Sequence, residues 1–360
     1  MAAALFPAED FPVLEYRLEE GERVEPVHYV PVLPMLLING AQGIGTGFST
    51  CVPAHSTSIL CAATRAYLAK QPLPELQPHF EGFKGTVEVK ANAVVTHGTI
   101  ERINDRAWRI TELPLGRWTE AFLTELKALA DGSKSIKHAP ISHITNMSTE
   151  FSVHIEIKLS EEVEEEQLVK ALRLHSSFSM ANMQAFDTQY LLNKYDSPRA
   201  IFEEHAQARL RLYEKRRAHQ LEQLQAKLDR LQGKVEFIRL VTAGELPLRG
   251  VPRAELVEQL RGMQLPEIDD YEYLLNMNIS SFTQERIKAL QQEAENTRAA
   301  LLRLREQQPA DLWLADLEVV EKAFADYLKR LEQRHADVPA AGTTTRRKAR
   351  ASQPPAKKRR

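Results

Sequence analysis

The sequence is poor in cysteine, has no long apolar run and does not start like a secreted protein. Its 360 residues include only Cys51 and Cys61, which cannot form a disulfide framework and suit a reducing compartment. No apolar run reaches the roughly 18 residues that a membrane helix needs, so we expect no membrane partner. The start, MAAALFPAED, has neither a basic segment nor a long apolar core, which argues against a secretory signal.

What the sequence has is an ordinary globular composition with an uneven charge. Apolar residues make up 43% and charged residues 27%, which is typical of a folded soluble protein. Residues 338–360 hold eight basic residues and no acidic one, so removing them from the formal net charge of −2 leaves −10. We therefore expect an acidic folded body and a disordered basic tail over 337–360. The tail suits a nuclear import signal or a nucleic-acid contact, and a plain solubilising tail is the alternative.

Residues 84–160 carry strand signals. A weak period-two pattern runs over 87–95, and apolar residues flank a turn at Asn104-Asp105. A stricter alternation over 151–159 predicts a half-buried strand. Its apolar members are Phe151, Val153, Ile155, Ile157 and Leu159.

A helix is expected between these strands, from Thr119 to Asp131. Its apolar residues share one face, and Gly132 suits the C-terminal cap. Strands and helix together make residues 30–195 read as a mixed α and β domain.

Residues 199–335 instead carry two heptad seams, which indicate long helices. A break over 244–252 and a shorter helix over 253–263 separate the seams. We expect two long antiparallel helices with a small helical knob between them, and a simple bundle packed on the sheet is the alternative. The first seam is Leu221, Leu224, Leu228, Leu231, Val235 and Ile238, and the second is Ile287, Leu290, Ala294, Thr297, Leu301 and Leu304.

The most distinctive stretch is the glycine-rich segment 29–53. Four glycines lie within eight positions, and such a run lets backbone amides approach a phosphate. A nucleotide-binding loop is nevertheless disfavoured, because the segment has no lysine and its Gly45-Thr46-Gly47 run lacks the third glycine of the dinucleotide fingerprint. The other interpretation is a tight bend that packs helix against strand.

The run from Tyr29 to Pro53 resembles the segment that follows the nucleophile domain in eukaryotic and viral type IIA DNA topoisomerases. Further motifs resemble this family in the same order, from about residue 5 to 335. They are Phe83–Thr86, Ile110–Pro114 with Trp118-Thr119, Ser179–Met183 with Phe186-Asp187, Lys194–Ser197, Tyr273–Met277 and Asp311–Trp313.

The resemblance implies an α+β fold: a mixed α/β tower domain, then a long antiparallel coiled coil and a helical C-gate dimerisation domain. We expect residues 1–29 to be a remnant that follows the winged-helix domain, and 30–198 to be the tower. Residues 199–336 would form the coiled coil and C-gate, with the gate at about 241–280.

The resemblance also implies an enzyme, an ATP-hydrolysing isomerase that passes one duplex through a transient double-strand break. The complete enzyme uses ATP and Mg²⁺. The family's nucleophilic tyrosine precedes the match, while Tyr16 and Tyr29 fall at non-catalytic positions. The acidic runs Asp269-Asp270 and Glu161–Glu166 do not form its metal site, and no ATPase glycine motif is present. We therefore expect no catalytic or metal residue here and no activity of the chain alone.

Two origins of such a chain remain open. The gene sequence is incomplete, or a separate polypeptide carries the ATPase, metal site and winged-helix parts. The alternative functions are a non-catalytic DNA-bending or dimerising scaffold and a coiled-coil interaction protein with no DNA role. By resemblance, the partners are double-stranded DNA and a second copy through the C-gate, and the location is the nucleus.

In the family, an isoleucine beside a proline wedges between base pairs, and we match it to Val52 and Pro53. Gly43, Gly45 and Gly47 would let the backbone approach phosphates. From the residues alone, Val52 could instead pack under the bend. One departure concerns Arg117, which lies one position later than the arginine of the family's motif, so any DNA contact of that arginine is in doubt here.

Overall fold

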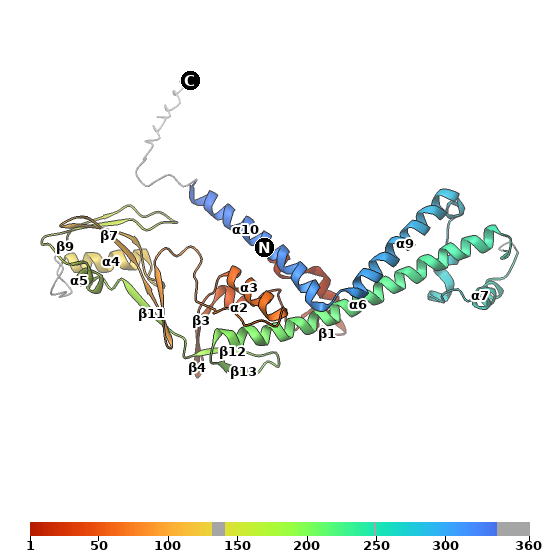
Figure 1. The fold of residues 1–360 in the computed structure, drawn as a ribbon, viewed down its shortest axis with the longest axis horizontal. Coiled ribbons are helices and arrows are strands. Elements are labelled where there is room, and N and C mark those ends of the chain that lie inside the picture. The colour runs from red at the N-terminus through yellow and green to blue at the C-terminus, as the bar shows by residue number, and fades with distance from the viewer. Residues whose placement is uncertain (132–140, 248–249, 337–360) are drawn as a thin grey trace, which may run out of the picture. The chain divides into compact units, whose positions relative to one another are not determined.

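The structure, a computed structural model, describes residues 1–131, 141–247 and 250–336. These form two compact units that alternate along the chain (Figure 1). Of these described residues, those within Met1–Pro34, Cys61–Leu73 and Phe202–Lys322 form the helical unit, and those within Met35–Leu60, Pro74–Ile201 and 323–336 form the sheet unit. Among the described residues, no helix is long and apolar enough to cross a membrane.

The longest element is α6 (Pro198–Thr242), which runs for 45 residues. Proline suits its first position because that N–H would have no helical partner, and the Ser197 hydroxyl accepts a hydrogen bond from the Ala200 N–H at 3.3 Å. The helix ends where Gly244 adopts a φ of +75°, a conformation that favours glycine. The expected long helix is therefore present.

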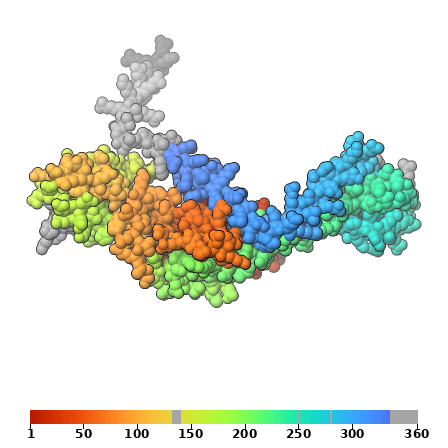
Figure 2. Space-filling view, in the orientation of Figure 1, coloured from red at the N-terminus to blue at the C-terminus, as the bar shows by residue number. Residues whose placement is uncertain are grey.

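Helix α9 (Gln284–Glu306) runs antiparallel to α6 within the helical unit (Figure 1). Lys227 on α6 pairs with Glu293 on α9 at 2.9 Å, while the earlier Arg217 donates to the later Arg305 carbonyl at 2.8 Å. Apolar residues of both heptad seams meet between the helices. Figure 2 shows the two helices in space-filling form, α6 in green and α9 in light blue. The cluster contains Leu231, Val235, Ile238, Ile287, Leu290 and Ala294.

The segment between the two helices forms a small knob with its own core. It contains α7 (Arg253–Gly262), a 3₁₀ turn η2 (Asp269–Tyr271), α8 (Glu272–Leu275) and a second 3₁₀ turn η3 (Ile279–Phe282). The helix expected over 253–263 is thus confirmed. The buried core of the knob comprises Phe237, Leu240, Leu246, Leu256, Leu260, Leu265, Tyr271 and Leu274.

The N-terminal segment belongs to the helical unit. It forms α1 (Ala2–Leu5), the 3₁₀ turn η1 (Ala8–Val13) and an antiparallel hairpin of β1 (Tyr16–Glu19) and β2 (Glu22–Pro26).

A buried ion cluster ties this segment to α6 and to α10 (Pro309–Ala336). The fully buried Arg209 donates to Asp10 Oδ2 at 2.5 Å and to the Val30 carbonyl at 2.6 Å. On the other side, Arg216 and the Tyr213 hydroxyl each donate to Asp316 Oδ2 at 2.7 Å.

The apolar side chains of α10 differ in how deeply they are buried. Leu317 and Val320 are fully buried, so they pack internally. Trp313 is also buried, and its indole N–H donates to the Val32 carbonyl at 3.1 Å. Tyr327, in contrast, is 44% exposed.

The sheet unit contains a four-stranded antiparallel sheet in the order β7-β8-β10-β9. Its strands are β7 (Thr99–Asn104), β8 (Ala107–Glu112), β9 (Ile141–Asn146) and β10 (Ile155–Leu159). Two helices, α4 (Thr119–Ala130) and α5 (Glu165–Ala171), cover its apolar face. The expected helix is confirmed, and the turn expected at Asn104-Asp105 lies one position later, at Asp105-Arg106.

Two strand expectations were wrong in detail. The strand predicted over 151–159 covers only the second half, and Phe151 lies outside it with 43% of its surface exposed. The pattern over 87–95 is not one strand but the hairpin of β5 (Thr86–Lys90) and β6 (Ala93–His97). Its turn, at Ala91-Asn92, contains no glycine or proline, so the usual residue signal for a break is missing there. With β11 (His175–Ser179), these strands form a three-stranded sheet.

The sheet unit also holds α2 (Met35–Asn39) and the first part of α3 (Thr57–Leu68). Two hairpins complete it: β3 (Ala41–Gly45) with β4 (Phe48–Val52), and β12 (Met183–Phe186) with β13 (Leu192–Tyr195). The acidic run Glu161–Glu166 enters α5 only at Glu165, so most of it lies before the helix. The Gly132 cap and the basic tail lie outside the described residues.

Candidate nucleic-acid interface

The glycine-rich segment folds into a two-stranded hairpin. Strand β3 (Ala41–Gly45) pairs with β4 (Phe48–Val52), so that Ala41 faces Val52 and Gly45 faces Phe48. Thr46 and Gly47 make the turn, where Gly47 adopts a φ of +84°. The segment is therefore neither a P-loop nor a strand–loop–helix, and the sequence did not predict its hairpin.

Gly40 sets the point at which the hairpin leaves α2. Its φ is +66°, and a Cβ there would lie 2.8 Å from the Val52 carbonyl oxygen and 2.9 Å from the Ala54 N. Only glycine allows this close approach of two backbones. Below the hairpin, the His55 N–H donates to the Leu37 carbonyl at 2.7 Å, and burial lowers the pKa of the His55 ring.

The five predicted DNA-binding residues occupy two different settings. Gly43, Gly45 and Gly47 are exposed, and a Cβ at Gly43 or Gly47 would meet nothing within 4 Å. Val52 is 3% exposed and Pro53 is also buried, so both pack at the base of the hairpin. This conformation favours the second interpretation of Val52, in which it packs under the bend.

The sequence motifs did not point to Ile44, which is 94% exposed near the tip of the hairpin. Phe48, close to it on the partner strand, is 37% exposed. A branched apolar side chain that is almost fully solvated and flanked by glycines is free to enter an apolar space on a ligand. Its alternation with glycine could have marked it, because it is the large apolar residue between Gly43 and Gly45.

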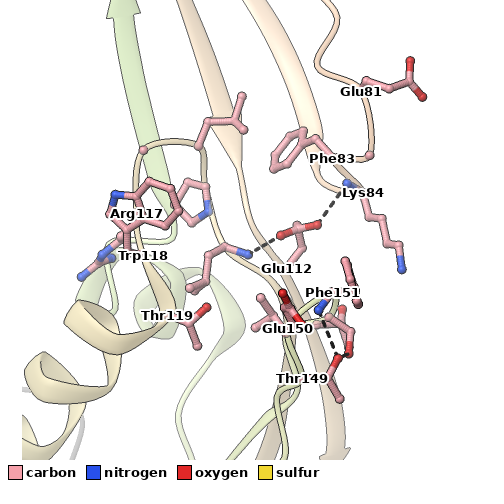
Figure 3. A pocket seen from close by; sticks show the side chains of 18 residues that line it. Glu81, Phe83, Lys84, Glu112, Arg117, Trp118, Thr119, Thr149, Glu150 and Phe151 are labelled. Carbon is pink, nitrogen blue, oxygen red and sulfur yellow. Dashed lines mark hydrogen bonds between the residues drawn. The ribbon is translucent and has the colours of Figure 1, made fainter. Parts of the chain in front are cut away.

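Elsewhere in the sheet unit, a concave region brings together three of the motifs noted in the sequence. It has a volume of about 550 Å³ and is lined in part by Phe83, Lys84, Trp118 and Phe151 (Figure 3). At its floor, the Glu112 carboxylate accepts hydrogen bonds from the backbone N–H groups of Lys84 at 3.2 Å and Leu113 at 3.0 Å (Figure 3). Trp118 is 79% exposed at its rim. Glu112 thus ties one motif to the next.

Arg117, the displaced arginine, is turned toward the protein. Its guanidinium donates to the carbonyls of Leu172 at 2.6 Å and Arg173 at 2.7 Å and pairs with Glu125. It also lies 4.7 Å from the centre of the Phe122 ring. These contacts use Arg117 to join the start of α4 to the end of α5.

The tyrosines and acidic runs considered in the sequence do not gather into a site. The Tyr16 hydroxyl donates to the Phe11 carbonyl at 3.0 Å, and Tyr29 packs edge-on against Phe6 and Phe11. Asp269 pairs with Arg230 at 3.1 Å. Within residues 1–131, 141–247 and 250–336, no group of three or more His, Cys, Asp and Glu side chains could hold a metal ion.

Comparison with known proteins identifies the family. A sequence model that describes the A subunits of DNA gyrase and topoisomerase IV matches residues 1–318. The chain belongs to the type II DNA topoisomerase family. It is 30% identical to the DNA topoisomerase 2 of Arabidopsis thaliana over 96% of this chain, and 35% identical to that of Pisum sativum over 71% of this chain.

The fold is also similar to a solved topoisomerase structure. The DNA-binding, cleavage and re-ligation domain of Plasmodium falciparum topoisomerase II matches 93% of this chain with a TM-score of 0.79 and 28% identity. The chain spans 50% of that domain and 26% of the Arabidopsis relative. The topoisomerase resemblance and the mixed α and β architecture expected from the sequence are thus confirmed.

Proposed function

We propose that this chain forms the part of a type II topoisomerase that holds and bends a DNA duplex, with the β3–β4 hairpin facing the DNA. The observation that carries this proposal is the 94% exposure of Ile44 at the tip of an uncharged, glycine-rich hairpin. An apolar side chain that enters a base step unstacks it and bends the duplex. The exposed backbone at Gly43, Gly45 and Gly47 supports contacts to phosphates that are independent of base sequence.

This proposal assigns the wedge to Ile44 rather than Val52. Val52 would have to leave its buried position to enter a base step, and that would cost about 1.5–3 kcal/mol for a side chain of this size. Ile44 is already solvated, so its insertion between bases gains apolar burial with no such cost. Val52 and Pro53 then serve the DNA contact indirectly, by fixing the base of the hairpin.

We further propose that the chain contributes to a homodimer. The support is the antiparallel pair α6 and α9, which carries at its end a knob over about 241–280 whose core also includes Phe237 and Leu240 of α6. Such a projecting helical hairpin suits a coiled coil that ends in a C-gate between two copies. Sedimentation of the chain at micromolar concentration should show a dimer, and a strictly monomeric chain would contradict the gate.

The remaining chemistry is assigned to other parts of the enzyme. We propose that the nucleophilic tyrosine, the Mg²⁺ site and the ATPase are supplied by segments other than residues 1–360, on the same polypeptide or on a separate one. The isomerase activity therefore belongs to the complete enzyme, and this chain alone should not relax supercoiled DNA. The basic tail would direct the protein to the nucleus or tether it to DNA.

Binding of a short DNA duplex at increasing salt tests the DNA role. Phosphate contacts release counterions, so the logarithm of the binding constant should fall linearly with the logarithm of the salt concentration. Undetectable or salt-independent binding would instead support a coiled-coil protein with no DNA role. Relaxation of supercoiled DNA by the purified chain with Mg²⁺ and ATP would contradict the assignment of the chemistry elsewhere.

A further inference from the structure

The DNA-facing hairpin is held against a neighbouring hairpin by side-chain hydrogen bonds and one backbone hydrogen bond. The neighbour consists of β12 (Met183–Phe186) and β13 (Leu192–Tyr195), and β12 lies against β4. The two hairpins are separate two-stranded sheets, so no strand ladder joins them. What joins them is a small group of polar contacts between Ser49–Cys51 and Asn182–Gln184.

Thr50 supplies the first of these contacts. Its hydroxyl donates to the Gln184 carbonyl at 2.7 Å and accepts from the Gln184 N–H at 3.1 Å. One side chain thus satisfies both main-chain groups of a residue on β12, as a neighbouring strand would do. A hydroxyl can do this because it is both donor and acceptor.

Asn182 supplies the second group of contacts. Its Nδ2 donates to the carbonyl and the hydroxyl of Ser49 at 2.5 and 2.6 Å, while its own backbone carbonyl accepts from the Cys51 N–H at 3.0 Å. The Gln184 side chain in turn donates to Asn182 Oδ1 at 2.9 Å, which fixes the amide. Three consecutive residues of β4 are therefore held by β12 and the turn before it.

These contacts act on Ile44 through one cross-strand pair. Ser49, which Asn182 holds, is the register partner of Ile44 on β3. An isolated two-stranded hairpin is marginally stable in water, and the glycines of β3 add backbone freedom. The direction of Ile44 therefore depends on how firmly β4 is held from its other side.

We propose that Thr50 and Asn182 are positioning residues that aim Ile44 at the DNA. This inference rests on the proposed DNA-bending role of the hairpin. Val52 and Pro53 hold the base of the hairpin, whereas Thr50 and Asn182 hold the part closer to the tip. Loss of either side chain should leave the fold intact but widen the range of directions that Ile44 takes.

The first test needs no DNA. Thr50→Val keeps the side-chain shape and removes the hydroxyl, Asn182→Ala removes the amide, and Thr50→Ser restores the hydroxyl. Thr86→Val, on the exposed β5, is the matched control. Hydrogen exchange of the β3–β4 amides should quicken about fivefold for each hydrogen bond lost in Thr50→Val and Asn182→Ala, and remain unchanged in Thr50→Ser and Thr86→Val. Equal exchange in all variants, with unchanged circular dichroism, would overturn the inference.

The second test uses a short duplex with 2-aminopurine at a flexible step, because this base fluoresces more strongly when it is unstacked. The full chain should raise the fluorescence, and Ile44→Ala should not. Thr50→Val and Asn182→Ala should lower the rise several-fold with little change in duplex affinity, and Thr50→Ser should restore it. If the wild-type chain and Ile44→Ala behave alike, the proposed function fails. If only Ile44→Ala differs and Thr50→Val matches the wild type, the positioning role alone is overturned.

Discussion

Ile44 and Val52 lie on opposite strands of one hairpin and have opposite exposures, 94% for Ile44 and 3% for Val52. The hairpin register places Val52 beside α2 and carries Ile44 to the turn. This arrangement separates a structural apolar residue from one that is free for a ligand. The two residues can therefore be tested against each other in the same element.

Truncation of the two side chains should affect stability very differently. Val52→Ala removes buried methyl groups and leaves a small cavity, which should lower the free energy of unfolding of the sheet unit by about 2 kcal/mol. Ile44→Ala removes a solvated side chain and should change it by less than about 0.5 kcal/mol. Thermal unfolding followed by circular dichroism measures both, and equal losses would contradict the assignment.

Substitution of Asp10 in the buried ion cluster should greatly lower the free energy of unfolding. Asp10→Ala leaves the fully buried Arg209 without its closest carboxylate, and breaking such a pair costs about 3–5 kcal/mol. Asp105→Ala is the control, because Asp105 pairs with Arg102 at the surface and such pairs contribute about 0–1 kcal/mol. Denaturant unfolding should separate the two variants clearly. A loss at Asp10 no larger than at Asp105 would show that the cluster does not anchor the N-terminal segment.

We expect the protein to lose stability in mild acid because His205 is held neutral in the folded state. Burial lowers the pKa of this histidine to about 4, while its Nε2–H donates to the Pro31 carbonyl at 3.0 Å. The unfolded chain binds the proton more readily, so the stabilisation is complete above the unfolded pKa of about 6.5 and is lost as pH falls toward 4.

This effect of acid on the free energy of unfolding has an upper limit, and it can be tested against a control substitution. The free energy of unfolding should fall by at most about 1.4 kcal/mol per pH unit. The fall should be smaller than this limit because part of the His205 side chain reaches solvent. His205→Gln should flatten the dependence between pH 6.5 and 4, whereas the exposed His143→Gln should not. Identical pH profiles for the wild type and His205→Gln would contradict the prediction.

Gly233 lies at a position of α6 where we expect alanine to be unfavourable. A Cβ there would lie 2.2 Å from the Tyr273 hydroxyl oxygen and 3.1–3.2 Å from two ring carbons. Gly233→Ala should therefore destabilise the helical unit by about 1–3 kcal/mol, although alanine is normally the better helix former by about 1 kcal/mol. Tyr273→Phe should recover part of the loss, because it removes the closest atom.

Gly262 gives the matched control for this substitution. It also lies in a helix, α7, but a Cβ there would meet nothing within 4 Å. Gly262→Ala should be neutral or stabilising in the same unfolding measurement. If Gly233→Ala behaves like Gly262→Ala, the close approach of Tyr273 to α6 is not present in solution.

The long helices could be predicted from the sequence because their signals are local and repeated. The heptad residues Leu231, Ile238 and Leu290 recur with helical spacing, and they meet in one buried cluster. The hairpin β3–β4 could not be predicted in this way. Its first strand contains Gly43 and Gly45, which have no side chains, so a period of two cannot appear.

Contacts between residues that are far apart in the chain could not be predicted from the sequence either. Arg209 and Asp10 lie 199 positions apart, and nothing in their neighbours marks them as a pair. Similarly, the family resemblance pointed to Val52 as the wedge, because a motif gives the residue type but not its exposure. Only the fold distinguishes the buried Val52 from the solvated Ile44.

The bend angle of a short duplex with a donor and an acceptor dye at its two ends tests the central claim most directly. The wild-type chain should shorten the distance between the dyes. Ile44→Ala should leave the bound duplex nearly straight with a similar salt dependence of binding, because phosphate contacts remain. Val52→Ala, at a temperature where it is folded, should still bend the duplex. A bend that survives Ile44→Ala, or is lost only in folded Val52→Ala, would contradict the claim that Ile44 is the wedge.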